Sequence, residues 1–118
     1  MKVLVVDDDP MAGMLIGAVI EDMGYQVLTV DNGVDAAQTL DQEPDVGLIV
    51  SDMHMPFISG IELFQSLREQ GVNIPFILLT GNDVEQASAQ APDIDACLKK
   101  SDDLDEVLPR TIHRVLGA

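Results

Sequence analysis

Several residue types that mark particular classes of protein are scarce in this chain. It has one cysteine, Cys97, so it forms no internal disulfide, and no cysteine–histidine cluster has the spacing of a zinc site. Its 6 lysines and arginines stand against 21 aspartates and glutamates, which gives a net charge of −15. A chain of this charge repels the phosphate backbone of nucleic acids, so we expect no direct nucleic-acid binding.

Long apolar runs are also lacking. The longest, residues 11–20, contains two glycines and is about half of the roughly 20 residues that a membrane span needs. The N-terminal segment reaches three aspartates before a signal peptide could develop its apolar region, and neither end has a lipidation motif. We therefore expect a cytoplasmic protein that neither spans nor binds a membrane.

Apolar residues are nevertheless abundant enough for a core. They make up 47% of the 118 residues, and the mean hydropathy is +0.18. A chain of this length typically forms one compact domain, and we expect residues 1–118 to be that domain. Five short runs rich in Val, Ile and Leu are typical of strands buried on both faces: residues 3–6, 27–30, 46–50, 75–79 and 96–98.

Segments with helical periodicity follow these runs. The first of these segments begins at residue 11, and the others cover residues 34–40, 59–70, 83–90 and 104–115. In the first, four apolar residues have the spacing of one helix face: Met11, Leu15, Ala18 and Val19. The fourth has little to bury and ends before Pro92, so we expect it to be short and mobile. Pro109 lies inside the last segment and must bend it or begin a fresh first turn.

The alternation of strands and helices predicts the fold class. Five strand–helix units in succession favour a doubly wound α/β protein, in which a parallel sheet has helices on both faces. In such sheets ligands lie outside the carboxyl ends of the strands. The polar residues that follow the strands therefore converge on one edge: Asp7, Asp8 and Asp9, then Ser51 and Asp52, then Thr80, and finally Lys99 and Lys100.

These side chains suit a metal ion and a phosphoryl group. Carboxylates from two strand ends repel each other, and a hard cation such as Mg²⁺ relieves the repulsion. A lysine and a threonine hydroxyl at the same edge bind an incoming anion. A carboxylate can itself be the nucleophile and form an acyl phosphate. Asp52 is the candidate, because it alone ends the central third strand.

Four motifs, in order, resemble a response-regulator receiver domain of two-component signalling systems. They are Val5-Val6-Asp7-Asp8-Asp9, Asp52-Met53-His54-Met55-Pro56 followed by Gly60, Leu78-Leu79-Thr80, and Leu98-Lys99-Lys100. The resemblance covers essentially the whole chain. It implies a flavodoxin-like (βα)5 domain whose sheet has the strand order 2-1-3-4-5.

The resemblance also implies a set of metal ligands. Asp52 corresponds to the phosphoacceptor, which is itself a ligand. Asp7 and Asp8 correspond to the acidic pair that binds Mg²⁺ directly or through water, with Mn²⁺ as an alternative ion. The backbone carbonyl of His54 completes the protein ligands.

The remaining family positions include two departures. Thr80 corresponds to the switch hydroxyl, and Lys100, rather than its surface neighbour Lys99, to the lysine that pairs with the phosphoryl group. Receivers usually carry Tyr or Phe where this chain has Cys97, and proline where it has Ser101. Because the threonine's shift is usually coupled to rotation of that aromatic ring, we expect the phosphorylation chemistry to be retained and its readout to differ.

Other residues near the motifs have simpler explanations. Asp9 precedes Pro10 and is expected to cap the first helix rather than to bind metal. The His54 side chain is expected to point outward, and His54 and Asn82 occupy positions at which receivers tune dephosphorylation. Cys97 is expected to be a small buried apolar residue rather than a redox sensor. Three methionines are expected to pack in the core and at its rim: Met11, Met14 and Met23.

The sequence thus predicts a signalling switch rather than an enzyme. A phosphohistidine on a sensor histidine kinase or a histidine phosphotransfer protein would donate the phosphoryl group to Asp52, and the changed surface would act on an unknown downstream protein. One alternative is a Mg²⁺-dependent phosphatase with Asp7 as the nucleophile of an Asp7-x-Asp9 motif. The others are a non-phosphorylated docking module and a flavin-binding domain, which lacks support because the chain has no phosphate-cradling loop after the first run.

Overall fold

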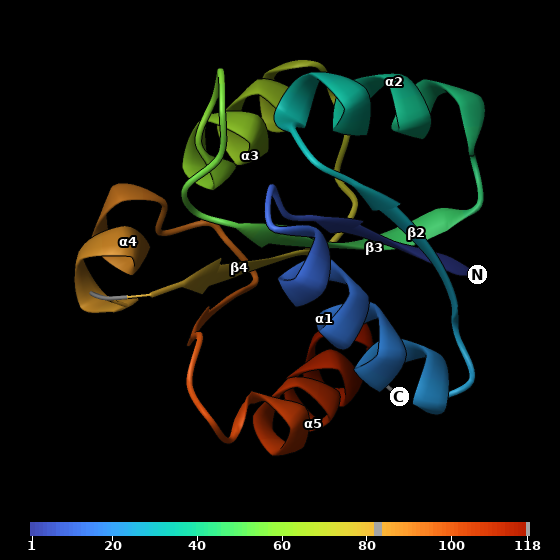
Figure 1. Ribbon diagram of the computed structural model, residues 1–118. Helices are drawn as coiled ribbons and strands as arrows, with labels where there is room; N and C mark the ends of the chain where they lie inside the picture. The colour runs from blue at the N-terminus through green and yellow to red at the C-terminus, as the bar shows by residue number, and fades with distance from the viewer. Residues whose placement is uncertain (82–83, 118) are drawn as a thin grey trace.

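Strands and helices alternate along the chain in the computed structural model, which describes residues 1–81 and 84–117 (Figure 1). The strands are β1 (Lys2–Val6), β2 (Gln26–Val30), β3 (Val46–Asp52), β4 (Phe76–Thr80) and β5 (Ala96–Lys99). The helices are α1 (Pro10–Asp22), α2 (Gly33–Gln42), α3 (Gly60–Glu69), α4 (Val84–Gln90) and α5 (Leu104–Leu116). Every predicted strand and helix is present.

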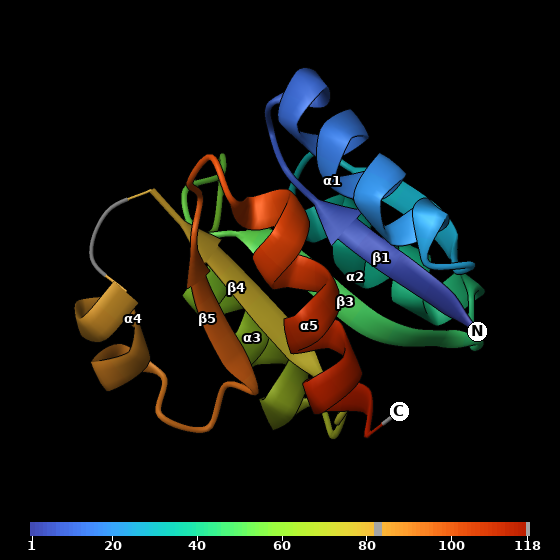
Figure 2. The ribbon, with the colours of Figure 1, turned by 90° about the horizontal axis from the view of Figure 1, so that it is seen from below.

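The strands form one parallel sheet in the order β2-β1-β3-β4-β5. Helices α1 and α5 cover one face of this sheet, and α2, α3 and α4 lie on the other (Figures 1 and 2). The predicted doubly wound α/β fold and its strand order are therefore confirmed. Successive residues of β1 point to opposite faces: Leu4 and Val6 pack in one buried cluster, and Val3 and Val5 in the other.

The outer strand β2 corrects one expectation. The prediction that all five runs are buried on both faces is wrong for β2, in which no residue is fully buried and Gln26 and Thr29 are exposed. The reason is its position at an edge of the sheet, where only β1 flanks it. The prediction holds only in part for β5, the other edge strand, in which Ala96 is buried but the next two residues are half-buried. The central strands β1, β3 and β4 follow the prediction, because they are flanked by strands and covered by helices.

Helix α1 corrects a second expectation. The predicted apolar face is wrong for Met11, Leu15 and Ala18, which are exposed. The helix instead turns its buried side to the sheet through Gly13, Ile16, Gly17 and Ile20. Gly17 allows this close approach, since a Cβ at this position would lie 3.3 Å from Val27. Of the three methionines expected in the core or its rim, Met23 packs there, whereas Met11 and Met14 are 67% and 65% exposed.

The last two helices can be compared with the predictions made for them. Helix α5 runs through Pro109 without a new start, so the prediction of a fresh first turn there is wrong; the burial of Leu108 and Ile112 compensates for the lost hydrogen bond. Helix α4 is short, as predicted, and Ala87 is its buried residue. Asp83, the predicted first residue of α4, lies outside the described residues.

Within residues 1–81 and 84–117, no helix is both long enough and apolar enough to span a membrane.

Candidate functional site

Three aspartates from two neighbouring strands meet at the carboxyl edge of the sheet. Asp7 and Asp8 follow β1, and Asp52 ends β3, which pairs with β1 in parallel. Each offers a carboxylate oxygen within 4.8 Å of the other two. Asp7 is buried, Asp52 is half-buried and Asp8 is exposed, so the cluster runs from the interior to the surface. The convergence that the sequence predicted is present.

Lys100 supplies the one ammonium group at this cluster among the described residues. It follows β5 directly, and its backbone N–H donates to the carbonyl of Thr80 at 2.8 Å. Its Nζ lies 2.7 Å from Oδ2 of Asp7 and 3.4 Å from Oδ1 of Asp52. Lys99 is exposed, as expected of a residue one step along the strand. Lys100, and not Lys99, therefore lies beside the carboxylates, and its pairing with a phosphoryl group stays a prediction.

Asp7 is fixed through both of its carboxylate oxygens. Oδ1 accepts from the backbone N–H of Asp9 at 2.9 Å, and Oδ2 accepts from Lys100. Only 1% of the Asp7 side chain is exposed, whereas 12% of the Asp52 side chain is exposed. Asp9 itself caps α1, accepting from the backbone N–H of Met11 at 3.0 Å, which confirms its predicted structural role. Asp52 is thus more accessible than Asp7.

Electrostatics at the cluster favour an additional positive charge. Burial raises the pKa of the Asp52 carboxyl; nearby Lys100 lowers it and the charge of Asp7 raises it further, and the net pKa is raised. For Lys100, burial disfavours the ammonium, but the hydrogen bond to Asp7 and the two carboxylate charges outweigh it, so its pKa is raised. One ammonium faces three carboxylates. At 4.8 Å, a pair of ionised carboxylates repels by about 3.5 kcal/mol at an effective dielectric constant of ~20.

This donor set fits a hard divalent cation. Carboxylate oxygens are the ligands that Mg²⁺ prefers, and it usually keeps several waters beside one or two of them. Asp8 and Asp52 keep the cluster open to solvent, which leaves room for those waters. The His54 side chain is exposed, as predicted, and the part of its backbone carbonyl in metal binding stays a prediction.

The other predicted residues lie on or after the neighbouring strands β4 and β5. Thr80 is buried at the carboxyl end of β4, next to β3 in the sheet. Cys97 is half-buried in β5 and packs against the hydrophobic core beneath α3 and α4. Burial raises the pKa of its thiol, and a hydrogen bond with Ser88 offsets only part of this rise. Cys97 therefore packs against the core, as expected, but it is half-buried rather than buried. Asn82, which was expected to tune dephosphorylation, lies outside the described residues.

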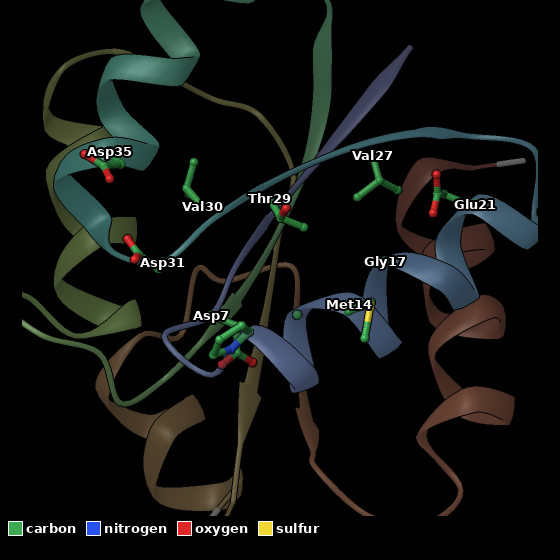
Figure 3. A pocket seen from close by; sticks show the side chains of 11 residues that line it. Asp7, Met14, Gly17, Glu21, Val27, Thr29, Val30, Asp31 and Asp35 are labelled. Carbon is green, nitrogen blue, oxygen red and sulfur yellow. The ribbon is translucent and has the colours of Figure 1, made fainter.

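A groove that the sequence analysis missed borders the cluster. It has a volume of about 510 Å³ and lies between α1 and the β2–α2 region (Figure 3). Asp7 forms one end of it, and Gly13 and Gly17 of α1 leave the space. The acidic side chains of Glu21, Asp31 and Asp35 stand at its sides. The spacing of the two glycines was the available signal in the sequence.

Comparison with known proteins identifies the family. The sequence profile of the response regulator receiver domain matches residues 3–111. The chain belongs to this family. A related protein, the sensor histidine kinase RcsC of Salmonella typhimurium, is 33% identical over 114 residues, which cover 95% of this chain and 12% of that protein. The chain thus spans 12% of the length of that relative.

Solved receiver structures have the same fold. The signal receiver domain of a signal transduction histidine kinase from Syntrophus aciditrophicus has a TM-score of 0.86 and 30% identity, covering 98% of this chain and 89% of the other. The response regulator TrrA of Thermotoga maritima, solved in complex with Mg²⁺-BeF, has a TM-score of 0.86 and 28% identity, with 97% of each chain covered. This protein is therefore a receiver domain of two-component systems in sequence and in fold.

Proposed function

We propose that this receiver domain accepts a phosphoryl group on Asp52 from a phosphohistidine. The observation that carries the proposal is the position of the Asp52 carboxylate. It is the accessible carboxylate beside Lys100, with 12% of its side chain exposed and an oxygen 3.4 Å from Nζ. A nucleophile must reach its substrate, and a nearby ammonium must neutralise the transferred charge.

The transfer uses groups that the structure brings together. A carboxylate oxygen of Asp52 attacks phosphorus, the P–N bond to the donor imidazole breaks, and the leaving nitrogen keeps the electron pair and takes a proton from solvent. Lys100 then pairs with the new phosphoryl oxygens while it still contacts Asp7, and Thr80 donates its hydroxyl hydrogen bond to the phosphoryl group. Water later attacks phosphorus, which releases inorganic phosphate and restores the carboxylate.

Asp7, Asp8 and Asp52 would hold Mg²⁺, or Mn²⁺ in its place, together with the carbonyl of His54. The ion would neutralise charge on the transferred group. The complex of the related TrrA with Mg²⁺-BeF supports this assignment. The close approach of three carboxylates in this chain supports it independently.

The phosphatase alternative places the covalent step on Asp7. Two features weigh against it: 1% of the Asp7 side chain is exposed, and each of its oxygens already accepts a hydrogen bond. A nucleophile held in this way has no free approach to a substrate. Asp7 is better suited to hold Lys100 and a metal ion.

The donor in this proposal is a sensor histidine kinase or a histidine phosphotransfer protein, and residues 1–118 act as one receiver unit. The relationship to sensor kinases supports a donor of this class. The net charge of −15 supports output through protein contacts rather than direct nucleic-acid binding. We place the reaction in the cytoplasm, where ATP charges histidine kinases. The domain is a switch, and its covalent chemistry is limited to gaining and losing its own phosphoryl group.

The test uses a small donor and intact mass. Wild type incubated with Mg²⁺ and acetyl phosphate should gain one phosphoryl group, and Asp52→Asn should gain none. Asp31→Asn, a change at an exposed aspartate outside the cluster, is the matched control and should react as wild type does. An adduct that persists in Asp52→Asn and is lost only in Asp7→Asn would support the phosphatase. No adduct in folded wild type would support a docking module.

A further inference from the structure

The loop between β3 and α3 presents an exposed aromatic side chain in an unfavourable backbone conformation. Phe57 is 82% exposed, more than any other large apolar residue among those described. Its φ is +73°, and within residues 1–81 and 84–117 it is the one non-glycine residue with a positive φ. Positive φ is uncommon outside glycine, asparagine and aspartate, and in a bulky residue it is an outlier.

A tight turn produces this conformation. The backbone N–H of Ile58 donates to the carbonyl of Pro56 at 2.9 Å, so Phe57 is the central residue of a three-residue γ-turn. With a positive φ at its centre, this turn is the rare and strained form. Such a conformation costs about 1–3 kcal/mol, and glycine would adopt it without the steric penalty.

The rest of the loop holds the turn in place. The backbone N–H of Met53 donates to Leu79, and that of Gly60 donates back to Met53, both at 2.8 Å. Met55 and Ile58 pack against the hydrophobic cluster on the α3 side of the sheet. Both flanks of Phe57 are therefore anchored inward, which keeps its ring out of the core. Figure 1 shows this segment standing out from the end of β3, beside α3.

The position of the ring relates it to the acidic cluster. Phe57 lies five residues after Asp52, in the loop that leaves the carboxyl edge of the sheet. Residues 53–61 contain no aspartate, glutamate, lysine or arginine, although 21 acidic residues are spread over the chain. A protein that delivers a group to Asp52 must cover this edge, and at residues 53–61 it meets an apolar ring rather than acidic side chains. A small donor has no need of that contact.

From these observations we infer that Phe57 is a docking anchor for the protein that carries the phosphohistidine. This inference rests on the proposed function. The partner it fits has an apolar pocket beside its phosphorylated histidine, into which the ring inserts. Aromatic side chains are enriched at protein interfaces and bury a large area each. A loop that already holds the ring outward also lowers the entropy cost of binding.

Other occupants of this surface fit less well. A second copy of the chain would bring another net charge of −15 against the acidic edge. Nucleic acid is repelled for the same reason. A protein donor can place basic or neutral groups opposite the acids and an apolar pocket opposite the ring, which gives the complementarity that an interface needs.

Cross-linking within living cells tests the identity of the occupant. The photoreactive residue p-benzoylphenylalanine is placed at position 57 in the full protein in its native cells, with the same substitution at Asn73 as the control. Asn73 is exposed in the loop that precedes β4, at the opposite edge of the sheet. We expect position 57, and not 73, to cross-link a protein whose purified form transfers phosphoryl from histidine to Asp52. Cross-links only within the same chain, to a protein without such a histidine, or to none would overturn the inference.

Kinetics with the captured donor separate docking from chemistry. In Phe57→Gly, transfer from that donor should slow at least tenfold, whereas the rate with acetyl phosphate should equal that of wild type. Glycine relieves the turn, so misfolding would not explain the loss. Equal transfer rates from the protein donor, or an equal fall with both donors, would contradict the role of Phe57. Failure of the proposed function is distinct, because wild type would then gain no adduct from acetyl phosphate.

Discussion

The two edges of the sheet differ in how their acidic side chains are paired with cations. At the amino edge, two cations, Lys2 and Arg68, are paired with acids. Lys2 Nζ lies 2.8 Å from Glu43 and 3.6 Å from Asp45. Arg68 lies 3.4 Å from Asp95 and stacks over an aromatic ring. These contacts join the ends of separate elements.

At the carboxyl edge the acids outnumber the cations. Asp7, Asp8 and Asp52 lie together, Lys100 pairs with Asp7 and Asp52, and burial raises the pKa of Asp52 by more than Lys100 lowers it. The chain thus supplies two cations for the three paired acids at the amino edge, but one ammonium for three clustered carboxylates at the carboxyl edge. Unbalanced charge costs stability and is retained where a ligand restores the balance. The amino edge is therefore built for stability, and the carboxyl edge for binding.

The largest expected change in the free energy of unfolding comes from Mg²⁺ binding, which offsets the negative charge at the carboxyl edge. At a Mg²⁺ concentration 100 times its Kd, the free energy of unfolding of wild type should rise by about 2.7 kcal/mol. Asp7→Asn should lose this rise at the same concentration, because a carboxylate ligand is missing. Urea unfolding with and without Mg²⁺ measures both values.

The amino edge supplies the control for metal binding. Asp45→Asn changes an exposed acid near Lys2 and should keep the full response to Mg²⁺. A response that is equal in all three proteins would mean that Mg²⁺ acts on the general surface charge, and the proposed contrast between the edges would fail.

The second-largest change in the free energy of unfolding is expected when an acid with a structural role is removed. Asp95 Oδ2 accepts from the backbone N–H of Phe76 at 2.8 Å and faces Arg68. Asp95→Ala should lower the free energy of unfolding by about 1–3 kcal/mol, because the N–H at the start of the buried strand β4 loses its acceptor. Asp93→Ala, at an exposed neighbour, should stay within about 0.5 kcal/mol of wild type. Matching losses in both variants would contradict the role of Asp95.

The contrast between the edges was only partly accessible from the sequence. The acids that follow β1 and β3 could be placed together because parallel strands end at one edge. The pairing of Arg68 with Asp95 could not, since it joins residues 27 apart through loops whose course depends on tertiary packing. The sequence therefore predicted the binding edge better than the stabilising one.

Helix α1 shows a similar limit. Apolar residues occur all around it, so periodicity alone could not select the buried side. Gly17 contributes to the selection, because its missing side chain lets the helix approach β2. Likewise, the γ-turn at Phe57 follows from the anchored flanks of its loop, and no local preference of phenylalanine predicts it.

The smallest expected change in the free energy of unfolding is a gain in stability rather than a loss. In EDTA at pH 7, Asp52→Asn should be more stable than wild type, in contrast to Asp95→Ala, which is less stable. Burial disfavours the Asp52 carboxylate, and asparagine removes that charge; the gain stays below about 1 kcal/mol because the attraction to Lys100 is lost as well.

The pH dependence of this difference identifies its cause. Below the unfolded pKa of 3.8 the Asp52 carboxyl is protonated in both states and carries no penalty. As pH rises, the unfolded chain loses this proton first, so the free energy of unfolding of wild type falls relative to Asp52→Asn until the raised folded pKa is passed. Urea unfolding in EDTA from pH 3 to 8 should show this gap open and then level. A gap of the opposite sign would mean that Lys100 outweighs burial, and a gap that persists below pH 3.8 would assign it to packing instead of charge.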